Sequence, residues 1–340
     1  MVIYHGQCNL RIKMKKFSLI LPVYNVEKYL PKCIESCLHQ DLSIAEYEII
    51  IIIDGSLDNS LQVARQYQQQ FDCIKIVEQS NKGLSASRNT GLKHAAGKYI
   101  WFIDSDDYIM PNVLKGIYHV LESTKLECLW IRWSNVDTQY NIMPLYDMNI
   151  HKVSETVYSG IEFMKHVLGI YLYAWSFIYN RNFLLSNNLW FKEGMYYEDT
   201  EFAFRALPLL KHIRLYNHVC YNYVNRAGSI VNTINEKQLV DICFNMTKAH
   251  RLYINAKDKE LKNFYKRSFS SFLLLVMKEV TKSKSLILKN KIIKIVRDEN
   301  MKKIIPIGNK ITKVIGLIYN ILGIKACFVV LAILFKIRDN

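Results

Sequence analysis

The sequence predicts an α/β fold with a mostly parallel sheet flanked by helices, within a chain of 340 residues. The first observation is a run of five isoleucines, residues 49–53, which is typical of a strand buried on both faces. The second is the alternation of apolar runs with segments of helical spacing between residues 17 and 107. The third is that polar and acidic residues directly follow these runs, at the end of an open sheet where ligands bind.

The predicted elements alternate between strand and helix along the chain. Residues 17–24 form an apolar run that Pro22 breaks, so we expect a buried strand leading into a loop. Residues 25–40 carry apolar side chains at helical spacing, and the isoleucine strand ends at the turn signal Asp54-Gly55. The remaining predictions are a helix at 57–71, a strand at 74–78, a helix at 83–96 and a strand within 98–107 that ends in acids.

The positive charge is concentrated at one end of the chain. The net charge is +15, yet residues 241–340 hold 21 Lys/Arg and 7 Asp/Glu, whereas residues 1–240 hold 24 and 23. A basic region binds nucleic acid or anionic lipid. Because no nucleic-acid-binding motif appears, we expect no nucleic-acid partner.

The cysteines and the first residues indicate a protein of the reducing cytosol. None of the eight cysteines has zinc-ligand spacing, and residues 1–19 lack the continuous apolar segment of a secretory signal. Residues 1–15 form an N-terminal extension before the first predicted strand. Because Met14 directly precedes Lys15, Lys16 and that strand, both Met1 and Met14 stay open as the first translated residue.

An acidic cluster follows the last strand of the alternating region. Asp104, Asp106 and Asp107 place three carboxylates within four residues, and these repel one another unless a cation lies nearby. Mg²⁺ and Mn²⁺ bind one or two carboxylates together with substrate phosphates. The cluster therefore predicts a divalent ion that joins Asp106 to a diphosphate. The alternative is a solvated acidic turn that caps a helix.

Taken in order, four motifs resemble family 2 glycosyltransferases with the GT-A fold, of the bacterial surface-polysaccharide type. The motifs are SLILPVYN, IDGSLDNS, NKGLSASRNTGLKHAAGKYIWFIDSDD and EDTEFAFR, and the resemblance covers about residues 16–230. It implies a Rossmann-like mixed sheet in a catalytic domain at residues 16–235. The donor half would be about residues 16–110 and the acceptor half about residues 111–235.

The resemblance also implies the reaction. An inverting, metal-dependent, non-processive hexosyltransferase would move a sugar from a nucleotide-sugar, by family habit a UDP-sugar, to a glycan or lipid-linked oligosaccharide in cell-surface polysaccharide synthesis. The cofactor would be Mn²⁺ or Mg²⁺. The alternative is a non-catalytic scaffold of the same fold that binds nucleotide-sugars. The donor sugar, the acceptor and the oligomeric state do not follow from the sequence.

Three residues near the first two strands match positions that bind the donor nucleotide. Pro22 and Tyr24 match the loop that packs on the base, and Asp54 matches the aspartate that contacts base and ribose. The alternatives are a core aromatic for Tyr24 and a turn residue for Asp54. The family usually has a second acid before this aspartate, and Ile53 departs from that pattern.

The diphosphate end of the donor site is implied by five further residues. Asp104 and Asp106 match the DxD motif, whose first acid faces the ribose and whose second acid binds the metal. Lys82 and Arg88 match positions near the donor, although Arg88 equally fits a structural ion pair. Arg226 matches a basic stretch near the diphosphate.

On the acceptor side, Asp199 matches the catalytic base, with Glu198 beside it. The alternative is that both acids simply begin a helix, where negative charge is favourable. Trp175 matches an acceptor-side segment, but Phe177 replaces a lysine that is common there. The QxxRW motif of processive members is missing, because Arg132-Trp133 lacks the glutamine and precedes the base.

Residues 236–340 are predicted to form a helical, basic region that associates with a membrane. Residues 314–335 are the most apolar stretch, interrupted by Asn320 and Lys325. One interpretation is a peripheral or anchoring helix on anionic lipid at the cytoplasmic face of the plasma membrane. The alternative is a helical domain that packs its apolar stripe on the rest of the protein.

Overall fold

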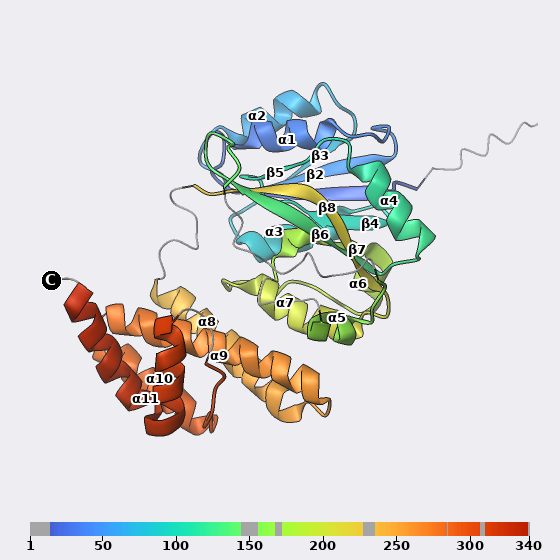
Figure 1. Ribbon diagram of the computed structural model, residues 1–340. Helices are drawn as coiled ribbons and strands as arrows, with labels where there is room; N and C mark the ends of the chain where they lie inside the picture. The colour runs from blue at the N-terminus through green and yellow to red at the C-terminus, as the bar shows by residue number, and fades with distance from the viewer. Residues whose placement is uncertain are drawn as a thin grey trace, which may run out of the picture. The chain divides into compact units, whose positions relative to one another are not determined.

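The structure is a computed structural model that describes residues 14–143, 156–166, 172–226, 235–283, 285–306 and 310–338 (Figure 1). Its contacts divide the chain into two compact units. The first comprises Met1–Trp133, Trp175–Asn188 and Tyr216–Tyr223, and the second comprises Ser134–Ala174, Leu189–Leu215 and Val224–Asn340. The N-terminal extension of residues 1–15 lies almost wholly outside the described residues.

The sheet has eight strands in the order β3-β2-β1-β4-β7-β6-β8-β5. The strands β1 to β4 pair in parallel, whereas β7 runs antiparallel to both β4 and β6, and β5 runs antiparallel to β8. The prediction of a mixed α/β sheet flanked by helices is therefore confirmed, and its parallel part comprises β1 to β4. The strands are β1 (Phe17–Val23), β2 (Tyr47–Asp54), β3 (Ile74–Gln79), β4 (Tyr99–Phe102), β5 (Tyr108–Ile109), β6 (Cys128–Val136), β7 (Phe177–Asn180) and β8 (Ile213–Val224).

The central strands are buried along their whole length, as their composition predicts. All eight residues of β2 and all seven of β1 are buried, because helices cover both faces of a parallel sheet (Figure 1). The helices of this region are α1 (Leu30–Leu38), α2 (Ser60–Gln68), α3 (Leu84–His94) and α4 (Leu114–Ser123).

The first two helices begin later than their apolar spacing predicts. Asn25 Oδ1 accepts a hydrogen bond from the Leu57 amide, and Asp58 Oδ2 accepts one from the Glu27 amide. Short polar side chains that bind backbone amides in this way compete with helix formation. The segments before α1 and α2 are therefore loops, and these hydrogen bonds join one loop to the other.

The C-terminal region is helical, as predicted. Its long helices are α8 (Glu236–Asn255), α9 (Lys259–Lys282), α10 (Leu286–Asp298) and α11 (Lys310–Arg338), drawn in orange and red in Figure 1. Asn235, Asp258 and Ser285 cap the first three, since each side chain accepts a hydrogen bond from a backbone amide of the first turn. The shorter helices are α5 (Gly160–His166), α6 (Arg181–Ser186) and α7 (Glu198–Ala206), with 3₁₀ turns η2 (Ala174–Ser176) and η3 (Leu207–Leu209).

Candidate active site

Asp54 lies at the carboxyl end of β2, where it organises the loop that enters α3. Its side chain is buried, with 3% exposed. Oδ1 accepts hydrogen bonds from Gln79 Nε2 at 2.7 Å and from the Lys82 amide at 2.9 Å, and Oδ2 accepts one from the Gly83 amide at 2.8 Å. The carboxylate thus accepts hydrogen bonds from the backbone amides just before α3, where a negative charge is favourable. The Lys82 side chain is exposed.

The loop after β1 presents a tyrosine to solvent. Tyr24 is 47% exposed, so the alternative of a core aromatic is wrong. Pro22 is buried and pairs with Ile52 across the β1–β2 ladder. Its carbonyl accepts a hydrogen bond of 2.6 Å from Ser105 Oγ, which ties this loop to the acidic cluster after β4.

Arg88 of α3 forms an ion pair with the first acid of that cluster. Its Nη2 donates to Asp104 Oδ1 at 2.8 Å, and the exposed fractions of the two side chains are 3% and 25%. The structure therefore contains the ion pair that the sequence left as one alternative. Because the pair includes Asp104, Arg88 also orients the carboxylate of a predicted donor residue.

Tyr221 of β8 supports the rest of the acidic loop. Its hydroxyl donates to Asp107 Oδ2 at 2.7 Å, and the Asp104 amide donates to the same hydroxyl oxygen at 3.2 Å. Burial and the nearby carboxylates of Asp107 and Asp104 raise the pKa of Tyr221, so the phenol stays protonated. Asp107 is buried and supports the loop through this hydrogen bond, whereas Asp106 is half-buried.

The acidic loop carries the two candidate ligands of the predicted metal. Among the described residues, no group of three or more His, Cys, Asp or Glu side chains is arranged to hold an ion. Asp104 and Asp106 together offer two carboxylates, and Asp104 already gives one oxygen to Arg88. Two carboxylates completed by substrate phosphates are an ordinary arrangement for Mg²⁺.

Trp175 lies inside an aromatic cluster of the first unit. Its ring stacks on Tyr221 with centroids 4.3 Å apart, meets Trp133 edge to face at 5.1 Å, and is 3% exposed. The structure gives Trp175 a packing role, and its acceptor-side role stays a prediction. Phe177, at the position of the common lysine, is 1% exposed and stacks on Trp130.

The predicted base lies in the second unit, at the start of α7. Glu198 and Asp199 occupy the first turn, as the helix-start alternative also predicts, and the Asp199 Oδ1 accepts the Thr200 amide at 2.7 Å. Glu198 is buried and Asp199 is half-buried. Tyr197, which precedes them, has a left-handed backbone with φ +58°. The chain therefore turns sharply at Tyr197 just before the helix that carries the two acids.

Side chains of α8 hold this helix start in place. Asp241 Oδ2 accepts the Tyr196 amide and Asn245 Nδ2 donates to the Tyr197 carbonyl, both at 2.9 Å. Lys248 forms an ion pair with Glu201 in the first turn of α7. Arg226, the last of the predicted site residues, is half-buried in the same unit.

The residues missed by sequence reasoning are those that orient the acids. Gln79, Ser105 and Tyr221 all touch predicted site residues or their loops. Gln79 ends β3, Tyr221 lies on β8, where the sequence predicts no particular element, and Ser105 is only the middle residue of the DxD motif. Of these three residues, only Gln79 could have been found from the sequence, because it is a polar residue at the end of a predicted strand.

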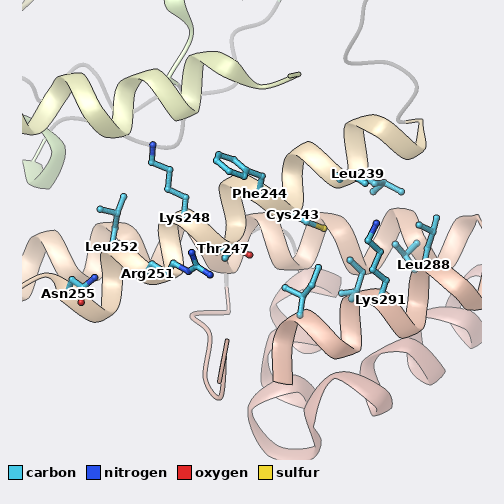
Figure 2. A pocket seen from close by; sticks show the side chains of 14 residues that line it. Leu239, Cys243, Phe244, Thr247, Lys248, Arg251, Leu252, Asn255, Leu288 and Lys291 are labelled. Atoms are coloured by element: carbon cyan, nitrogen blue, oxygen red, sulfur yellow. The ribbon is translucent and has the colours of Figure 1, made fainter. Parts of the chain in front are cut away.

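A separate apolar pocket of about 490 Å³ lies among α8, α9 and α10 of the second unit (Figure 2). Leucine, isoleucine, valine and Phe244 side chains dominate its lining, and none of the predicted site residues takes part. Lys248, Arg251 and Lys291 also line it, and the first two are paired with Glu201 and Glu299. This pocket does not have the chemistry of a nucleotide site.

Comparison with known proteins agrees with the geometry. Residues 18–186 match Glycosyl transferase family 2. The chain is 30% identical over 217 residues to the glycosyltransferase EpsJ of Bacillus subtilis, covering 63% of this chain and 62% of EpsJ. It is 26% identical to the cholesterol galactosyltransferase of Borreliella burgdorferi, covering 77% of this chain and 74% of that protein. This chain therefore spans less than two thirds of the length of EpsJ.

The fold also matches solved structures. The structure of S. aureus TarS residues 1–349 in complex with UDP-GlcNAc superposes with a TM-score of 0.69 at 20% identity, covering 94% of this chain and 91% of that one. The complex of the same fragment with UDP gives a TM-score of 0.70. This likeness shows the shared GT-A fold.

Proposed function

Because the chain belongs to glycosyl transferase family 2, we propose that it transfers a sugar, with inversion, from a UDP-sugar to a glycan or lipid-linked oligosaccharide of the cell surface. The observation that carries the proposal is the acidic edge of the sheet. Asp54 ends the parallel strand β2 and Asp104 follows the parallel strand β4. The loop amides of Lys82 and Gly83 hold the Asp54 carboxylate, and Arg88 holds that of Asp104. The TarS complexes with UDP and UDP-GlcNAc support the choice of nucleotide.

At the donor end, Asp106 and Asp104 would hold Mn²⁺ or Mg²⁺. The bound ion would stabilise the negative charge of the departing diphosphate. Arg88 keeps one Asp104 oxygen in place and offsets part of the negative charge of the cluster. Tyr24, exposed on the neighbouring loop, is available to pack on the nucleotide base.

At the acceptor end, Asp199 would act as the general base. Its carboxylate would take the proton of an acceptor hydroxyl while that oxygen attacks the anomeric carbon from the face opposite the diphosphate. The bond to the diphosphate breaks as the new glycosidic bond forms, so the anomeric configuration inverts. The hydrogen bond from the Thr200 amide orients this carboxylate. Without a QxxRW motif, we expect one sugar to be added per encounter.

The place of the reaction would be the cytoplasmic face of the plasma membrane. The described residues include one helix, Lys310–Leu334, that is long and apolar enough to cross a membrane. The basic excess of residues 241–340 favours an anionic surface. A lipid-linked acceptor would be presented at that surface.

Donor binding tests the proposal before any acceptor is known. We would titrate UDP-GlcNAc, UDP-glucose, GDP-mannose and dTDP-glucose calorimetrically in Mn²⁺ and in EDTA. We expect one UDP-sugar to bind in Mn²⁺ and to bind about tenfold or more weakly in EDTA or to Asp106→Asn. Asp72→Asn, an exposed acid, is the matched control. Equal binding by all variants in EDTA would contradict the proposed metal site.

A measurement of turnover distinguishes the enzyme from the alternative, a non-catalytic scaffold. A scaffold would bind the same UDP-sugar without releasing UDP in the presence of acceptor-containing membranes. Loss of release on Asp199→Asn, with donor binding retained, would identify an enzyme.

A further inference from the structure

The candidate membrane span is broken in the middle by a glycine. As one straight helix, residues 310–334 would be about 37 Å long, enough for the roughly 30 Å hydrocarbon core of a bilayer. Gly323, however, has φ +78° and ψ −177°, a backbone conformation that is essentially restricted to glycine. The helix α11 is therefore two helices joined at Gly323.

The two halves fold back on each other. Cys327 Sγ donates to the carbonyl oxygen of Ile315 at 3.4 Å, and both residues are buried. In a straight helix these residues would lie about 18 Å apart along the axis. Residues 310–322 and 324–338 thus form a hairpin whose arms are each about 20 Å long, too short to cross the hydrocarbon core.

Polar contacts fasten the first arm to the segment before it. Asn320 Oδ1 accepts the Ile304 amide at 2.8 Å, and Asn320 Nδ2 donates to the Ile304 carbonyl at 2.9 Å. The Tyr319 hydroxyl donates to the Met301 carbonyl. Insertion as a straight helix would break these bonds and leave the Asn320 amide among lipid tails.

The outer face of the hairpin is apolar and exposed. One side of each arm packs inward through side chains such as Ile315 and Phe328. The opposite side presents a stripe at helical spacing that seven large apolar side chains form, with exposed fractions from 52% to 79%: Ile311, Val314, Leu317, Ile321, Leu322, Val329 and Ile333.

The charges around this stripe are of one sign. Residues 301–338 contain seven Lys/Arg and no Asp/Glu. Five of the lysines are exposed: Lys302, Lys303, Lys310, Lys313 and Lys325. An apolar stripe bordered by exposed cations complements a surface that combines apolar depth with negative head groups.

We propose that residues 310–338 form a re-entrant hairpin that lies in one leaflet of an anionic membrane and does not cross it. The inference deepens the proposed membrane location and rests on it. The stripe enters the head-group boundary, the lysines contact the anionic lipid, and both ends of the hairpin stay on the same side. This arrangement would attach the chain to the surface at which a lipid-linked acceptor is presented.

Flotation of the full chain tests the docking face. We expect the wild type to float with vesicles of phosphatidylcholine and phosphatidylglycerol and much less with phosphatidylcholine alone. The double variant Ile321→Gln/Leu322→Gln should float about tenfold less, because two exposed apolar side chains no longer enter the lipid. Leu57→Gln, 90% exposed in the first unit, is the matched control and should float as the wild type does.

Labelling of the vesicle-bound chain tests the topology. Lys310→Cys and Arg338→Cys, each in a Cys8→Ser background, are treated with a membrane-impermeant maleimide added outside the vesicles. In the hairpin both cysteines react before detergent is added. Protection of either one until detergent is added shows a crossing helix and overturns the proposal.

Two further outcomes separate the inference from the proposed function. Wild type that stays unbound on anionic vesicles overturns the inference, and dimerisation lost in Ile321→Gln/Leu322→Gln would then assign the stripe to a second copy. Calorimetric UDP-sugar binding is measured on the same preparations. Vesicle docking without donor binding would contradict the proposed function and support the membrane-docking hairpin. Donor binding without vesicle docking would support the proposed function and contradict the hairpin.

Discussion

Asp54 offers the sharpest perturbation of the nucleotide end of the site. Its buried carboxylate accepts three hydrogen bonds, two of them from the backbone amides of Lys82 and Gly83. Asp54→Asn keeps the size of the side chain but replaces one acceptor oxygen with a donor NH₂ group. That group faces an amide N–H and cannot accept from it.

The expected cost follows from this count. At least one hydrogen bond to a charged acceptor is lost, and the charge that strengthens the others disappears, each such bond contributing about 1.5–3 kcal/mol. We therefore expect Asp54→Asn to lower the free energy of unfolding by about 2–4 kcal/mol. For a chain of 340 residues, whose unfolding entropy is about 0.7 kcal/mol per kelvin, that corresponds to a fall in Tm of roughly 3–6 °C.

Urea unfolding followed by circular dichroism gives the stability, and UDP titration gives the donor affinity. Asp72→Asn, exposed on the surface, is the control and should change stability by less than about 0.5 kcal/mol. An Asp54→Asn protein as stable as the wild type would refute the loop-organising role. Lost UDP binding at unchanged stability would instead assign the carboxylate to direct contact with the donor.

Three other predictions concern the ion pair, the acid limb of stability and the hairpin. Arg88→Met should destabilise by about 2–4 kcal/mol in urea, since it strands the partly buried Asp104 charge; no change would contradict this. Burial opposes charge at Glu48, but hydrogen bonds led by that of Lys75 lower its pKa. The ionised Glu48 therefore stabilises the fold fully above the unfolded pKa of about 4.5, and this stabilisation is lost as the pH falls through the lower folded pKa. In Glu48→Gln, Tm measured against pH should fall less steeply on the acid side than in the wild type. Gly323→Ala should cost about 1–3 kcal/mol by thermal unfolding, and an unchanged Tm would speak against the hairpin.

The sequence predicts the sheet well because its strands are continuous apolar runs. The isoleucines of β2 have no helical or solvent-facing alternative, so their burial follows from composition. The helix starts are harder to predict, since Asn25 and Asp58 bind amides of a loop about 30 residues away. Such pairings depend on tertiary structure that a local pattern does not contain.

The site residues divide in the same way. Motif spacing finds Asp54, Asp104 and Asp106 at strand ends, but it does not show that Arg88 pairs with Asp104 or that Tyr221 supports the loop. These partners come from other elements.

Packing and the C-terminal turn also lie beyond local patterns. Trp175 shows that a motif match does not reveal burial, because three aromatic neighbours from other segments cover its ring. The turn at Gly323 escapes prediction too, since a single glycine between apolar segments is also compatible with a straight helix.

Sugar transfer itself is the measurement that tests the central claim most directly. Purified chain would be mixed with the UDP-sugar that binds and with acceptor-containing membranes, in Mn²⁺ or EDTA, and UDP release would be followed for the wild type, Asp106→Asn and Asp199→Asn. We predict release that requires the metal and falls about 10²-fold or more in each variant. Release that continues unchanged in EDTA and in both variants would contradict the assignment of these aspartates to the reaction.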